Sequence, residues 1–147
     1  MRDYGKFFYF KRALLLRFYY FTTKFDCATA KFNGKKFTLE VADTWAKIRL
    51  GLSFRHAVGE SDGMIFVYGK SEPHIIWMFN TRIDLDVVWL DGKGRVVHLV
   101  KGAHKARSWL DFDVFEPKMH SEYVIELPAG YIAKYGVREG SLFSISL

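Results

Sequence analysis

The sequence has a single cysteine, Cys27, and no apolar run near its start that is long enough for a membrane-directed segment. One cysteine excludes an internal disulfide and any metal or iron–sulfur site that needs several cysteine ligands. Lys11, Arg12 and Arg17 leave only residues 13–16 between charges. A secretory signal needs roughly 7 to 15 apolar residues and a membrane span roughly 20. We therefore expect a cytoplasmic protein, with a peripheral position at a membrane surface as the alternative.

The sequence also lacks a basic cluster on its main body. The net charge is +6, but residues 1–26 hold six Lys/Arg against two Asp/Glu and contribute +4 of it. The remaining residues hold 16 Lys/Arg against 14 Asp/Glu and are therefore close to neutral. A domain that binds nucleic acid usually carries a basic stripe on its own surface. We expect no nucleic-acid partner.

The composition is that of one folded domain. The chain has 147 residues, of which 50% are hydrophobic and 18% aromatic, which is ample for a core. Ten of the 26 aromatic residues fall within residues 1–26. We expect a basic aromatic N-terminal segment (1–26) followed by a single β-rich globular domain (27–147).

Aromatic and leucine residues of the N-terminal segment recur at spacings of three and four, which indicates one apolar helix face. These residues are Phe7, Phe10, Leu14, Phe18, Phe21 and Phe25. With basic residues on the other face, such a helix could lie on an anionic membrane surface. There are two alternatives. The apolar stripe could pack on the core of the domain itself, or the natural protein could start downstream of this segment.

Short strands and turn residues dominate the rest of the chain. Asn33-Gly34 between two alternating runs predicts a hairpin, and Thr44 predicts the cap of a helix that ends near residue 54. Apolar runs at 64–68 and 75–79 predict central strands covered on both faces. A second short helix is expected before Gly136. We predict a mostly β domain with two short helices (α+β), in the form of a compact antiparallel β-barrel-like domain.

Two groups of polar residues are candidates for chemistry. The five histidines are scattered without an i, i+4 pair, so we expect no metal site and no cofactor. Asp84 and Asp86 stand beside apolar strands and would point to the same face of a strand. They could act as an acid and base pair, or they could cap a turn by accepting hydrogen bonds from backbone amides.

Four segments together resemble the domain of unknown function 192 family. They are GLSFR (51–55), DGMIFVY (62–68), WMFNT (77–81) and LDVVWLD (85–91), and YVIELPAG (123–130) follows in the order of the family pattern. The resemblance implies a compact β-barrel-like fold and no known activity. It also implies that the residues matching the family pattern surround a shared groove: Arg55, Asp62, Trp77, Asn80, Thr81 and Asp86.

Our leading hypothesis is a non-catalytic binding module. An apolar groove walled by Trp77, with Arg55, Asn80, Thr81 and Asp86 as orienting groups, would receive a small polar ligand or a peptide. The first alternative is a hydrolase or transferase that uses Asp84 and Asp86. The second is a membrane-surface interaction protein that binds through residues 7–25. The oligomeric state is left open.

Overall fold

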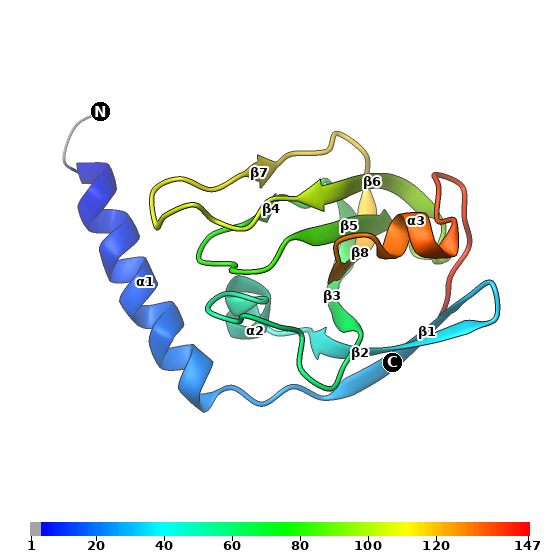
Figure 1. Ribbon diagram of the computed structural model, residues 1–147, viewed down its shortest axis with the longest axis horizontal. Helices are drawn as coiled ribbons and strands as arrows, with labels where there is room; N and C mark the ends of the chain where they lie inside the picture. Colours follow the sequence, from blue (N-terminus) through cyan, green and yellow to red (C-terminus); the bar gives the residue numbers. More distant parts are fainter. Residues whose placement is uncertain (1–3) are drawn as a thin grey trace.

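Seven strands form one sheet that curls into a half-barrel; α2 and α3 lie against this sheet, and α1 packs beside α2 at one end of it (Figure 1). The computed structural model describes residues 4–147, with side chains described from residue 11 onward. In chain order the elements are α1 (Tyr4–Thr22), β1 (Cys27–Phe32), β2 (Lys35–Ala42), α2 (Trp45–Leu50), β3 (Gly63–Glu72), β4 (Ile76–Trp77), β5 (Leu85–Leu90), β6 (Val96–Ala103), β7 (Val114–Phe115), β8 (Ser121–Pro128), α3 (Tyr131–Tyr135) and β9 (Ser144–Ser146).

The large sheet has the order β6-β5-β8-β3-β2-β1-β9, and β4 and β7 form a separate two-stranded sheet. Its neighbouring strands are antiparallel except β2 and β3, which run parallel. The segment before β9 reaches across to the opposite edge. Val96 N–H donates to the Ser141 carbonyl at 2.8 Å, and Phe143 N–H donates to the Gly94 carbonyl at 2.9 Å. These bonds protect the β6 edge and produce the barrel-like shape.

Several local predictions are confirmed. Asn33 and Gly34 have φ of 47° and 75°, as a two-residue turn between β1 and β2 requires. The Thr44 hydroxyl accepts a hydrogen bond from Lys47 N–H at 3.3 Å and caps α2. Gly136 ends α3 with φ of 68°. The predicted fold class is confirmed as a mostly β, α+β domain with a curled sheet.

Two boundary predictions and one strand direction were wrong. The helix after Thr44 ends at Leu50 instead of near residue 54, because Gly51 takes a positive φ of 49°. The expected central strand at 75–79 is only Ile76–Trp77, and it pairs with β7 outside the large sheet. Residues 75–79 are apolar because Ile76 and Met78 are buried in the apolar cluster that also contains Met64, Val87 and Trp89 of the large sheet. The parallel pairing of β2 and β3 was also not expected from the sequence.

The two faces of the sheet bury separate apolar clusters. One cluster joins Phe37, Ile65 and Val88 to Ile132 of α3. The other joins Met64, Val87 and Trp89 to Leu52, which follows α2. Every residue of β5 is buried, because this strand lies inside the sheet with both faces covered.

Asp86 of β5 is buried on the α3 face, with 1% of its surface exposed. One carboxylate oxygen accepts a hydrogen bond from Gly102 N–H at 2.9 Å. The other accepts from Gly130 N–H at 3.0 Å and from Ile132 N–H at 2.7 Å. A single side chain thus joins β5 to the end of β6 and to the start of α3.

We expect Asp86→Ala to lower the free energy of unfolding by about 3 kcal/mol or more, because three buried or half-buried amides lose their acceptor. Asp84→Ala is the matched control: its exposed carboxylate accepts one bond, from Lys105 N–H at 2.7 Å, so the loss should be about 1 kcal/mol or less. Urea unfolding followed by circular dichroism measures both. Equal, small losses would show that Asp86 does not hold these segments together.

Candidate functional site

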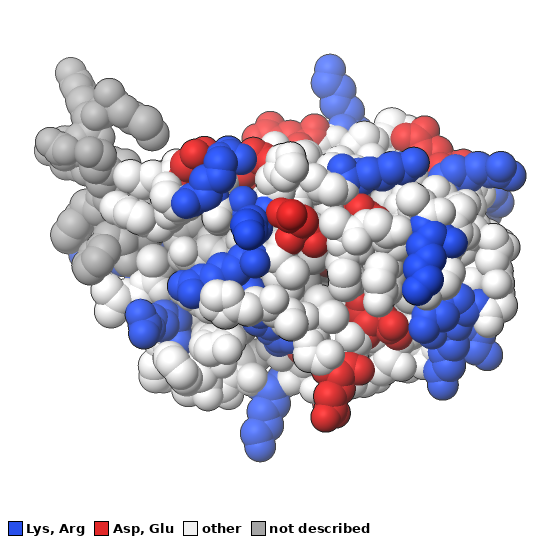
Figure 2. Space-filling view, viewed as in Figure 1, with Lys and Arg blue, Asp and Glu red and all other residues white. Residues whose placement is uncertain are grey.

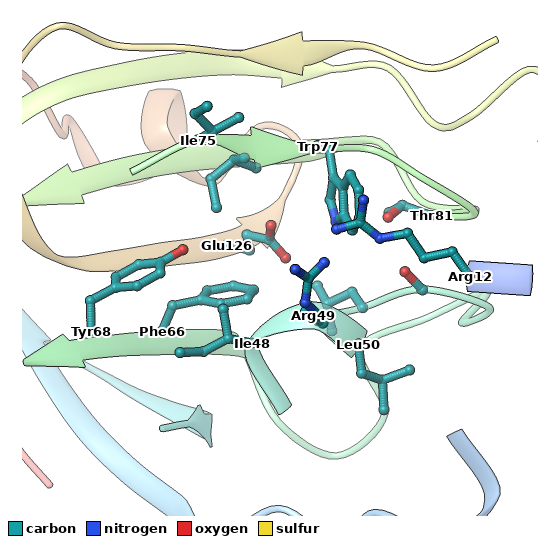
Figure 3. Close-up of a pocket in the computed structure, with 14 residues that line it drawn as sticks. Arg12, Ile48, Arg49, Leu50, Phe66, Tyr68, Ile75, Trp77, Thr81 and Glu126 are labelled. Carbon is teal, nitrogen blue, oxygen red and sulfur yellow. The ribbon is translucent and has the colours of Figure 1, made fainter. Parts of the chain in front are cut away.

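A pocket of about 320 Å³ opens between α2, β3 and β4 (Figure 3). Its volume lies at the lower end of the range for small-molecule sites. Most of its wall is apolar, and its polar groups come from five separate parts of the chain. The lining residues are Arg12, Ile48, Arg49, Leu50, Gly51, Leu52, Ser53, Phe66, Tyr68, Ile75, Ile76, Trp77, Thr81 and Glu126.

The polar group at the base of the pocket is the carboxyl group of Glu126 (Figure 3). In the sheet Glu126 stands opposite Met64 of β3 and Val87 of β5, both of which are fully buried. Its side chain is 4% exposed. The described residues donate no hydrogen bond to it, and burial alone raises its pKa to about 8. At neutral pH this side chain is therefore predominantly a neutral carboxylic acid.

Tyr68 contributes part of the aromatic wall of the pocket. Its ring packs on Phe66, with ring centroids 6.4 Å apart, and its hydroxyl points toward the carboxyl group in Figure 3. Burial raises the pKa of this hydroxyl far above its usual range, and the negative charge of an ionised Glu126 raises it further. Tyr68 therefore stays a neutral hydroxyl that can donate or accept a hydrogen bond.

Arg49 extends from α2 into the same pocket (Figure 3). Its guanidinium lies over the Trp45 ring at 4.6 Å from the ring centre. Its Nε atom is buried and has no hydrogen-bond partner among the described residues. A buried guanidinium donor without an acceptor costs free energy, so this atom would gain by meeting an oxygen of a bound molecule.

Arg12 of α1 closes one side of the pocket by stacking on Trp77, with its guanidinium 4.3 Å from the ring centre. Trp77 in turn packs on Phe79, with centroids 5.6 Å apart. The pocket thus combines two guanidinium groups with one carboxyl group.

Gly63 explains how the chain brings Glu126 to this position. A Cβ atom on Gly63 would overlap the backbone carbonyl oxygen of Glu126, so no other residue fits where β3 begins. Because β3 and β8 pair so closely, Glu126 of β8 lines the same pocket as Phe66 and Tyr68 of β3.

Of the residues predicted from the sequence, the structure brings Trp77 and Thr81 into the pocket. Thr81 is 4% exposed and pairs with Ser53 across a short bridge. Asn80 lies beside them but serves the backbone: it has a positive φ of 51°, and its carbonyl accepts from Phe54 N–H at 2.8 Å.

The other predicted residues do not line this pocket. Arg55 forms a two-point ion pair with Glu40, with both N–O distances 2.7 Å. Asp62 accepts from Thr38 N–H at 2.8 Å and lies 3.5 Å from the Lys35 ammonium. The carboxylates of Asp84 and Asp86 both accept hydrogen bonds from backbone amides, but these amides belong to segments far along the chain and not to the local turn that the capping alternative expected. The geometry gives no support to an acid and base pair at Asp84 and Asp86.

The sequence prediction missed Arg12, Arg49, Tyr68 and Glu126. A signal was present for Glu126, because it interrupts the apolar run of residues 123–128 and stands within the YVIELPAG segment. A charge in the middle of a central strand is rarely buried without a partner. Arg49 gave no such signal, since a basic residue in a short helix is usually solvated.

The described residues contain neither a cluster of metal ligands nor a helix that could cross a membrane. Within 4–147, no group of three or more His, Cys, Asp or Glu residues is placed to hold a metal ion. No helix in this part of the chain is both long enough and apolar enough to cross a membrane. On the described part of the face in Figure 2, Lys and Arg lie among Asp and Glu without forming one basic stripe. The absence of a nucleic-acid partner stays a prediction.

The fold and the pocket together define a small half-barrel domain with a ligand-sized pocket against one face of its sheet. The chain belongs to the domain of unknown function 192 family, described as an uncharacterized ACR, whose model matches residues 28–145. The helix α1 precedes the matched region.

A sequence relative agrees with this family, and two solved structures share the fold. A UPF0127 protein of Thermococcus gammatolerans is 35% identical over 106 residues, which are 72% of this chain and 65% of that protein. The chain thus spans less than two thirds of this relative's length. A solved structure from Sinorhizobium meliloti, of a protein proposed to be a transcription regulator, has a TM-score of 0.72 at 22% identity and covers 84% of this chain and 96% of that one.

A second solved structure, of a protein of unknown function from Novosphingobium aromaticivorans, has a TM-score of 0.68 at 25% identity. The match covers 82% of this chain and 84% of that one. Both structures support the half-barrel fold.

The buried carboxyl group predicts an unusual dependence of stability on pH. The pKa of Glu126 is about 8 in the folded protein against 4.5 for an ordinary glutamate, so the folded state holds the proton more tightly. Its contribution to stability is greatest below pH 4.5 and is lost as pH rises toward about 8. The loss should be on the order of a few kcal/mol.

Glu126→Gln should remove this loss, so the variant should be more stable than the unsubstituted protein at pH 9 and nearly equal to it at pH 5. Urea unfolding at both pH values measures the difference. Glu60→Gln, at an exposed carboxylate, is the control and should change neither value. If the free energy of unfolding depends on pH in the same way in both proteins, Glu126 is not a buried neutral acid.

Proposed function

We propose that this domain is a non-catalytic binding module whose pocket receives a ligand with an apolar body and a carboxylate head group. The observation that carries the proposal is a pair of buried polar groups in one pocket. Arg49 Nε has no hydrogen-bond acceptor, and the Glu126 carboxyl group has no hydrogen-bond donor, among the described residues. A protein interior leaves few polar groups in this condition unless a bound molecule completes them.

The charge of the pocket selects the head group. Arg12 and Arg49 are always ionised, whereas the pKa of Glu126 is about 8, so the pocket carries a net positive charge at neutral pH. A carboxylate would accept hydrogen bonds from a guanidinium and from the neutral Glu126 acid at the same time. An amine would face two guanidinium groups and find no ionised partner.

The apolar wall selects the body of the ligand. Phe66, Trp77 and Ile75 present aromatic and branched surfaces around the polar base (Figure 3). A volume of about 320 Å³ suits one aromatic or branched aliphatic group rather than an extended chain. Two sources offer this chemistry: a small organic acid, or the C-terminal residue of a peptide.

We expect thermal unfolding to distinguish the head groups with three probes that share a phenyl body: phenylacetate, phenylacetamide and phenethylamine. A ligand at 100 times its Kd adds about 2.7 kcal/mol, which raises the midpoint by several degrees. Phenylacetate should raise the midpoint of the full chain, and the amide and the amine should not. A short peptide ending in phenylalanine, with a free or an amidated C-terminus, separates the peptide source from the small acid.

Substitutions locate the site. Arg49→Gln should abolish the shift, and Arg138→Gln, at an exposed arginine, is the matched control that should keep it. Glu126→Gln should keep the shift, because the amide N–H donates a hydrogen bond as the acid O–H does. In the unsubstituted protein the ionised Glu126 should repel the ligand carboxylate above about pH 8 and weaken binding, and the variant should not show this weakening. A shift by the amine alone, or a carboxylate shift that persists in Arg49→Gln, would contradict the proposal.

A further inference from the structure

The outward face of α1 carries large apolar side chains that the domain does not cover. Leu14 is 58% exposed, Phe18 is 62% exposed and Phe21 is 72% exposed. At about 100° per residue these three positions fall within roughly 60° of one another around the helix axis. They form a continuous stripe, which we call the outer stripe.

A different stripe attaches α1 to the domain. Leu16 is 1% exposed and packs with Ala13 and Tyr19 against Leu50 and Phe79. On a helical wheel Leu16 lies about 160° or more from Leu14 and Phe18. Core packing therefore accounts for one face of α1 and leaves the outer stripe without a described partner. Figure 1 shows α1 at one end of the half-barrel, beside α2, with its other side open.

Basic residues flank the outer stripe. Lys11 and Arg17 are exposed and lie on the two sides of the stripe, about 60° from Leu14. Lys24 is exposed just after the helix. From residue 4 to residue 25 the sequence contains no Asp or Glu.

We infer that the outer stripe binds the surface of an anionic lipid bilayer, with α1 parallel to the membrane plane. An apolar stripe of Leu and Phe that is bordered by Lys and Arg, with no acidic residue, is the arrangement of interfacial helices. The apolar side chains enter the headgroup boundary, and the cations face the lipid phosphates and carboxylates. This charge complementarity favours an anionic bilayer over a second copy of the protein as the partner of the stripe. Two copies of α1 would repel each other, because both carry Lys and Arg and no Asp or Glu between residues 4 and 25.

The experiment is co-sedimentation of the full chain with vesicles. The protein should pellet with phosphatidylcholine vesicles that contain phosphatidylserine, and pellet much less with phosphatidylcholine alone. High salt should weaken the binding, because it screens the basic residues from the lipid headgroups. Failure to pellet with the anionic vesicles would overturn the inference.

Two variants test the stripe and its charge separately. Phe18→Ser with Phe21→Ser should weaken binding at least about tenfold. Leu142→Ser with Met119→Ser, at exposed apolar residues away from α1, is the matched control and should bind as the unsubstituted protein does. Arg17→Glu should weaken binding, whereas Lys101→Glu, at an exposed residue of β6, should not.

Circular dichroism must show that all four variants keep the fold, which we expect because every substituted side chain is exposed. Light scattering after gel filtration tests the competing occupant. A dimer that dissociates on substitution of Phe18 and Phe21 would show that a second copy covers the stripe, and would overturn the membrane assignment. Equal vesicle binding by the stripe variant and the unsubstituted protein would overturn it as well.

Discussion

A carboxyl group inside a protein must either accept hydrogen bonds or give up its charge, and this domain contains one side chain in each condition. Asp86 and Glu126 stand on neighbouring strands, β5 and β8, and are buried on opposite faces of the same sheet. Asp86 accepts three backbone hydrogen bonds and thereby joins β6 and α3 to the sheet. Glu126 receives none from the described residues, and its pKa rises to about 8. The rest of the structure follows from this division: one face is closed by a helix, and the other keeps a pocket.

This division also separates structural residues from residues available for function. Arg55, Asp62, Asn80 and Asp84 hold neighbouring segments in place through ion pairs and backbone bonds. Glu126 and the Nε atom of Arg49 are buried in one pocket whose wall is mostly apolar, and neither forms an ion pair or a hydrogen bond to the backbone among the described residues. Burying polar groups without hydrogen-bond partners costs free energy. A carboxylate ligand would satisfy both groups at once, which is why we assign the pocket, and not the turn at Asp84 and Asp86, to function.

The sequence predicted the parts of the fold that local chemistry decides. The Asn33-Gly34 turn, the Thr44 cap and the Gly136 helix end depend on backbone conformation at one or two residues. The family motifs led to Trp77 and Thr81, which do line the pocket. Arg12 and Arg49 could not be found in this way, because only the tertiary arrangement brings α1 and α2 to the same cavity. The outer stripe was partly visible from the spacing of Leu14, Phe18 and Phe21, but the sequence did not show that Leu16 would carry the core contact instead.

The most direct measurement is a carbon-13 NMR titration of the Glu126 side-chain carboxyl group, with and without phenylacetate. The free protein should show a Glu126 pKa near 8, far above the 4.5 of an ordinary glutamate. Bound phenylacetate should raise this pKa further, because a second carboxylate beside Glu126 disfavours its ionisation. A Glu126 pKa near 4.5 in the free protein, or a pKa that is unchanged by phenylacetate at saturating concentration, would contradict the assignment of this pocket as a carboxylate-binding site.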